Sequence, residues 1–121
     1  MAEELDIEIL SEKHITNVEA YEILKKIIKK IEEHEGAVPP LLLKTLNYLS
    51  HAKKLDPEAA SSLKRTLEKY NLKPETIIMI VNICPETVDE LRILFEPEER
   101  FIDTETTNEI LQTVKTYCQQ E

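Results

Sequence analysis

Glycine is nearly absent from this sequence, since Gly36 is the only one among 121 residues. Loops of the GxGxxG and GxxxxGK[ST] types hold phosphate groups with backbone N–H groups, and they need several glycines so that a phosphate can approach the backbone. Neither pattern occurs in the chain. The sequence therefore excludes a glycine-rich phosphate-binding loop.

Side chains that bind metals or act as nucleophiles are also scarce. The chain has two cysteines and three histidines, and none of them stands at the spacing of a metal site. The EEHE run at residues 32–35 is typical of a solvated helix end, because successive positions on a helix point in different directions. We expect no catalytic residue, no metal site and no cofactor.

Long apolar runs are missing as well. The acidic start, MAEELDIEIL, lacks the apolar core of a signal peptide, and no run is long enough to span a membrane. We therefore expect a cytoplasmic protein in a reducing compartment, where Cys84 and Cys118 are free thiols. A disulfide between these two cysteines is the alternative.

Positive charge is in deficit, because 24 acidic residues outnumber 15 basic ones and give a net charge of -9. Such a surface repels phosphate backbones and favours basic protein partners. Lys25, Lys26, Lys29 and Lys30 form a basic patch, but the interleaved glutamates favour ordinary solvation over nucleic-acid binding. Nucleic acid is therefore not expected to be the sole partner.

What the chain does contain is helical patterning. Thr16 and Glu19 fit a capping box, which predicts a helix from there to about residue 35 with Gly36 at its C-cap. The apolar side chains of this segment fill a stripe about 160° wide, whereas a surface helix usually shows about 100°. They are Ala20, Tyr21, Ile23, Leu24, Ile27, Ile28 and Ile31.

Further helices are expected along the rest of the chain. The segment from VPP to about residue 54 is apolar over well over half of its circumference, which predicts a central position. Pro57, Pro74 and Pro85 stand where a proline in the first turn of a helix is tolerated. TIIMIVNIC at 76–84 indicates a short helix buried on all sides, with a buried strand as the alternative. A last helix should run from about residue 103 to residue 118.

The first residues follow the period of a half-buried β-strand, because apolar side chains at 5, 7 and 9 alternate with acidic ones at 6 and 8. A lone strand leaves its backbone N–H and C=O groups unpaired, so residues 5–9 are expected to join the edge of a sheet supplied by another chain. A frayed terminus or the beginning of the first helix is the alternative. The wide apolar stripe of the first helix, which one bundle cannot easily cover, favours the partner.

The order of these motifs resembles a known family. KLDPEAA, PETIIMIVNICPETVDELR and EILQTVKTY are similar to segments of the F-type subunit of archaeal RNA polymerase, the counterpart of the fourth subunit of the eukaryotic enzyme. The resemblance covers about residues 5 to 118. It implies a mainly α fold, with an N-terminal strand-like arm and long helix over residues 1–37 and a compact HRDC-like helical bundle over residues 38–121.

A function is implied by the same resemblance. The family member is a non-catalytic subunit that forms a heterodimer with the E-type subunit of the polymerase, which we call the stalk partner because the pair makes up the stalk of the enzyme. The stalk supports promoter opening, transcript binding, elongation and termination. The stalk partner carries the main RNA-binding fold, so any contact of this chain with transcript RNA would be weak or indirect.

The resemblance also implies where the two proteins meet. The contact with the stalk partner, and through it with the polymerase core, would involve Leu5, Ile7, Ile9, Ile15, Tyr21, Leu24 and Ile28. A free-standing HRDC-like nucleic-acid-binding module is the alternative function.

Overall fold

The fold is built from short helices joined by tight connections. The structure, a computed structural model, describes residues 13–34 and 36–118, and these residues contain no β-strand. None of the helices found there combines the length and the apolar character needed to cross a membrane. The predicted mainly helical fold class is confirmed. The elements are α1 (Asn17–Glu33), α2 (Pro40–Ala52), α3 (Pro57–Glu68), α4 (Pro74–Ile83), α5 (Val88–Leu94), the 3-10 helix η1 (Glu96–Glu98) and α6 (Thr104–Cys118).

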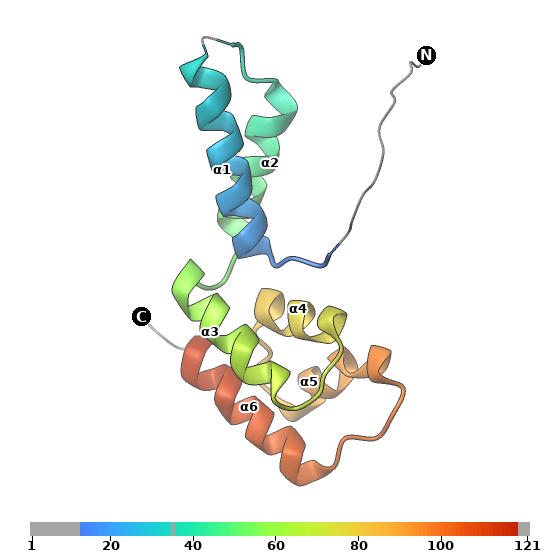
Figure 1. The fold of residues 1–121 in the computed structure, drawn as a ribbon. Coiled ribbons are helices and arrows are strands. Elements are labelled where there is room, and N and C mark those ends of the chain that lie inside the picture. Colours follow the sequence, from blue (N-terminus) through green and yellow to red (C-terminus); the bar gives the residue numbers. More distant parts are fainter. Residues whose placement is uncertain (1–12, 35, 119–121) are drawn as a thin grey trace, which may run out of the picture.

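The helices form two groups, which Figure 1 shows as a projecting hairpin of α1 and α2 above a compact bundle of α3 to α6. The prediction that the second helix is central is wrong. Leu49 is the buried residue of α2, whereas Leu41 and Tyr48 are exposed. The apolar character of α2 goes around most of the helix, but α1 packs along only one side of it.

The start of α1 confirms the predicted capping box. Thr16 Oγ1 accepts a hydrogen bond from the backbone N–H of Glu19 at 3.1 Å, and the Glu19 carboxylate accepts one from the backbone N–H of Thr16 at 2.8 Å. The end of the helix differs from the prediction, because the C-cap is His34 rather than Gly36. Gly36 instead donates its N–H to the carbonyl oxygen of Ile31 at 3.0 Å.

The hydrophobic core lies between α3, α4, α5 and α6, and Val18 at the start of α1 joins it. The stripe predicted for α3 is buried there at Ala59, Ala60, Leu63 and Leu67. These side chains meet apolar residues from the other three helices, so the bundle has one continuous core. Its fully buried side chains include Leu63, Leu67, Ile80, Val81, Leu91, Ile110 and Val114.

Proline begins three of the helices, but not all of those predicted. Pro40, Pro57 and Pro74 stand at the first helical position. Pro85 does not, because α5 begins at Val88 and is capped by Thr87. Cys84 adopts a left-handed conformation with φ 54°, which ends α4. The chain then needs three residues to reverse direction before α5 starts.

Helix α4 contains the segment for which a helix or a buried strand was predicted. The segment 76–84 lies in a helix over Pro74–Ile83, so the strand alternative is wrong. It is not buried on all sides, because Ile83 is half exposed.

The last helix is capped by Asp103, whose carboxylate accepts the N–H of Thr106 at 2.7 Å. This hydrogen bond lowers the pKa of Asp103 below its ordinary value.

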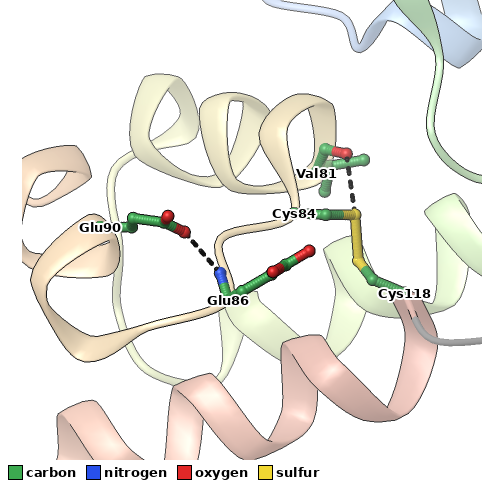
Figure 2. Close-up of a disulfide and its surroundings, with 5 residues drawn as sticks. All are labelled: Val81, Cys84, Glu86, Glu90 and Cys118. Carbon is green, nitrogen blue, oxygen red and sulfur yellow. Dashed lines mark hydrogen bonds between the residues drawn. A yellow bond between two sulfur atoms is a disulfide. The ribbon is translucent and has the colours of Figure 1, made fainter.

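Cys84 and Cys118 form a disulfide, so the expectation of free thiols is wrong. The bond joins the C-cap of α4 to the last residue of α6, with 6.1 Å between the two Cα atoms (Figure 2). Helix α6 packs along α3 and α5 and thereby brings Cys118 back to the end of α4. The sequence spacing of 34 residues does not reveal this return. The Cys84 sulfur also lies 3.9 Å from the carbonyl oxygen of Val81. This is a van der Waals contact and not a hydrogen bond, because a disulfide sulfur carries no proton.

Two sequence predictions remain untested by this fold. The strand over residues 5–9 lies outside the described residues. The division of the chain at residues 37 and 38 also stays a prediction. In the structure α2 lies beside α1, and the core of the bundle begins after it, at Leu55.

Candidate partner-binding surface

The residues predicted to contact a partner differ in their exposure. Leu5, Ile7 and Ile9 lie outside the described residues. Ile15, Tyr21 and Leu24 are half-buried, so each retains accessible surface. Ile28 is 7% exposed and is therefore covered within this chain.

The hairpin carries exposed apolar side chains that were not among the predicted contacts. Ile23 and Ile27 of α1 are 50% and 44% exposed. Leu41, Leu43 and Tyr48 of α2 are exposed as well. Leu41, Leu43 and Tyr48 could have been found from the wide apolar circumference of their segment, but this pattern was interpreted as a sign of a central, buried helix. Several large apolar side chains exposed on both helices of a projecting hairpin make it a candidate for a protein–protein interface.

A cavity of about 290 Å³ is lined by one residue that was predicted to contact the partner and by one exposed residue that was not. It lies between the start of α1 and the start of α3, and both Ile15 and Ile23 line it. Val18 and Ala60 form apolar parts of its wall. The cavity extends the exposed apolar surface of α1 towards the bundle.

The base of the hairpin is fixed to the bundle by polar contacts. The backbone N–H of Asn17 donates to Oδ1 of Asn82 at 2.8 Å, which ties α1 to α4. Lys64 on α3 places its ammonium group 3.0 and 3.2 Å from the two carboxylate oxygens of Glu19. Burial raises the pKa of Glu19, but hydrogen bonds from the Thr16 N–H and from Lys64 outweigh it, so the pKa lies below the ordinary value. These contacts set the direction in which the hairpin projects.

Lysines cover the sides of α1 that face the solvent. Lys25, Lys26, Lys29 and Lys30 are all exposed. The ammonium group of Lys25 also lies 5.2 Å from the ring centre of Tyr21, and that of Lys53 lies 5.1 Å from it. The predicted contact residue Tyr21 is therefore bordered by two positive charges.

A second exposed apolar pair lies on the bundle. Ile93 and Phe101 are 73% and 77% exposed and border a cavity of about 630 Å³. The guanidinium group of Arg92 lies 5.4 Å from the centre of the Phe101 ring. Arg92 also donates to the Ile102 carbonyl oxygen at 3.1 Å, so its charge is partly engaged in holding this connection.

Side chains that could bind a metal ion do not gather into a site in the described ranges. No cluster of three or more His, Cys, Asp or Glu side chains there could hold a metal ion. His34 and His51 are exposed, and the ring nitrogen Nδ1 of each lies 2.9 Å from a backbone carbonyl of its own helix.

Comparison with known proteins gives consistent matches along the chain. The family model described as RNA polymerase Rpb4 matches residues 14–118. "DNA-directed RNA polymerase subunit Rpo4" of Sulfolobus acidocaldarius is 30% identical over 100 residues, which cover 82% of this chain and 87% of that protein. The protein of the same name from Methanocaldococcus jannaschii is 32% identical over 111 residues, covering 90% and 88% of the two chains. Its namesake from Saccharolobus solfataricus is 26% identical over 98 residues, covering 80% and 86%.

Proposed function

Because this chain belongs to the RNA polymerase Rpb4 family, we propose that it is a non-catalytic subunit that pairs with the stalk partner to form the stalk of a DNA-directed RNA polymerase. In that place it supports promoter opening, transcript binding, elongation and termination as part of the complex. It works in the cytoplasm, and its own contact with RNA is weak or passes through the stalk partner. The relatives named Rpo4, which align over most of the chain, support this assignment.

The observation that carries the proposal is the exposed apolar surface of the α1–α2 hairpin. Ile23, Ile27, Leu41 and Tyr48 leave apolar area in water on a hairpin that projects from the bundle. Burying such area against a second protein is favourable by about 25 cal/mol per Å² of apolar surface, before the cost of association. A protein that packs against the hairpin therefore accounts for its apolar character.

The N-terminal segment adds a second contact in this proposal. Residues 5–9 join the edge of a sheet in the stalk partner, with Leu5, Ile7 and Ile9 facing its core. Ile15, which lines the cavity at the start of α1, continues this contact towards the hairpin. Residues 1–37 thus form the main partner-binding part, and residues 38–121 the HRDC-like part, with α2 contributing its exposed leucines to the same interface.

The test is co-expression with the stalk partner from the same organism, followed by size-exclusion chromatography with light scattering. We expect a 1:1 complex that is lost, or weakened at least about tenfold, by deletion of residues 1–10 or by Ile7→Asp. Ile93→Asp is the matched control, because it places the same charge on an exposed isoleucine of the bundle and should leave the complex intact.

Two other outcomes have clear meanings. A complex that survives both N-terminal changes would remove the strand contact and leave the hairpin as the interface. A monodisperse monomer that ignores the stalk partner, but binds RNA or DNA in a salt-dependent manner, would overturn the stalk assignment in favour of a free-standing nucleic-acid-binding module.

A further inference from the structure

Four side chains on α1 form a continuous strip that combines apolar and positive groups. Residues three or four apart are neighbours on a helix surface, so Ile23, Lys26, Ile27 and Lys30 adjoin one another. All four are exposed in the structure. We call these four residues the Ile–Lys strip. It offers two apolar side chains with an ammonium group beside each.

The strip lies in the part of the chain that is positively charged. Residues 13–54 contain eight lysines and five glutamates, which gives this part a net charge of +3. Residues 55–118 contain seven basic and thirteen acidic side chains, which gives a net charge of -6. The overall acidity of the chain therefore conceals a hairpin of opposite sign that projects from an acidic bundle.

We propose that the Ile–Lys strip receives an acidic, apolar segment of the stalk partner. Aliphatic side chains of that segment pack against Ile23 and Ile27, and its carboxylates face Lys26 and Lys30. This inference rests on the proposed function, and it adds the chemistry of the surface that the strip binds. It also revises the simple expectation from net charge, since the chain as a whole would favour a basic partner.

A protein segment fits the strip better than a nucleic acid does. Residues 13–54 contain no arginine, the side chain that pairs best with phosphate and stacks on bases. Isoleucine adds nothing to the binding of a phosphate backbone, and neither isoleucine is a platform for base stacking. The acidic bundle would also repel a polyanion that extends beyond the hairpin.

The charge separation has a consequence for association. An acidic segment approaching this chain is attracted to the hairpin and repelled by the bundle, which orients the encounter. Electrostatic attraction of this kind acts mainly on the association rate and weakens as salt is added. The rate constant for binding the stalk partner should therefore fall steeply with ionic strength.

The experiment measures binding of the stalk partner by stopped-flow fluorescence at about 50 mM and about 500 mM salt. The variant is Lys26→Glu with Lys30→Glu. The control is Lys69→Glu with Lys115→Glu, which changes the net charge equally at two lysines of the bundle. Circular dichroism checks that both variants keep the helical content of the wild type.

At low salt we expect the strip variant to associate at least about tenfold more slowly than the wild type and to lose most of its salt dependence. The control should change the rate less than about threefold. A strip variant that binds like the control would overturn the inference while leaving the stalk assignment in place. A wild type that forms no complex would instead overturn the proposed function. Competition by single-stranded RNA, lost in the strip variant, would assign the strip to nucleic acid and also overturn the inference.

Discussion

At the scale of the residue, Glu98 has a structural role that its charge does not suggest. Its buried carboxylate accepts the backbone N–H of Lys73, the N-cap of α4, at 2.7 Å and lies 3.5 Å from Nε of Arg100. We expect Glu98→Ala to lower the free energy of unfolding by about 1–3 kcal/mol, because the backbone N–H of Lys73 loses its charged acceptor at the start of α4. Urea denaturation measures this change. Exposed Glu96→Ala is the control, and equal losses in both variants would contradict the role of Glu98.

Glu19 makes the stability of the hairpin base depend on pH. Its pKa is lowered in the folded chain, so it contributes stability above its unfolded pKa and loses this contribution as the pH falls through the folded pKa. We expect the wild type to lose stability between about pH 5 and pH 3, and Glu19→Gln to decline less steeply. Thermal unfolding across this range measures the difference. Asp103, whose pKa is also lowered, contributes alike to both proteins. An equally shallow decline in Glu22→Gln would contradict the prediction.

At the scale of the element, the disulfide fastens the end of α6 to the end of α4. Closing a loop of this length stabilises a fold by about 2–4 kcal/mol, because the unfolded chain loses conformational freedom. We expect reduction, or Cys118→Ser, to lower Tm by on the order of 10 °C. Calorimetry with and without reductant measures the shift. The doubly substituted protein, Cys84→Ser with Cys118→Ser, should not respond to reductant. Recovery of two alkylated thiols without reductant would contradict the bond.

Local sequence signals predicted most helix starts but not the turns between helices. Thr16 and Glu19 act through hydrogen bonds within one turn, and Pro57 suits the first turn of a helix because it has no N–H that needs a partner there. In both cases the residues themselves determine where the helix begins. Pro85 carries the same local signal, yet it lies in the reversal after Cys84. Where a chain reverses depends on the packing of α4 against α5, which is a tertiary property. The disulfide was only the alternative prediction for the same reason, because the approach of Cys118 to Cys84 also depends on how the helices pack.

At the scale of the whole molecule, the hairpin carries both exposed and buried apolar side chains, and these should differ in their effect on stability. We expect Ile23→Ser with Ile27→Ser to change the free energy of unfolding by less than about 1 kcal/mol, since both side chains are exposed. Buried Leu49→Ala should cost about 2 kcal/mol or more. Chemical denaturation of the isolated chain compares the two. Equal destabilisation would mean that the isoleucines belong to the core of this chain rather than to an interface.

The candidate surface was predictable in character but not in detail. The wide stripe of the first helix indicated that something beyond one bundle covers it, and Ile23 and Ile27 retain exposed area. Periodicity could not tell which side of the stripe α2 takes. Ile28, which the resemblance placed at the contact, is covered within the chain, whereas the exposed Leu41 and Tyr48 were not among the predicted contacts.

The disulfide also sets how far the chain can be drawn out. If the N- and C-termini of the chain are pulled apart, the segment between Cys84 and Cys118 bears no tension, because the disulfide transmits the force directly from one cysteine to the other. At about 3.3–3.6 Å per extended residue, the 34 residues of this separation hold about 110–120 Å of hidden length. An oxidised chain held under load would thus extend less than a reduced one by this length, and the addition of a reductant would release it in one step.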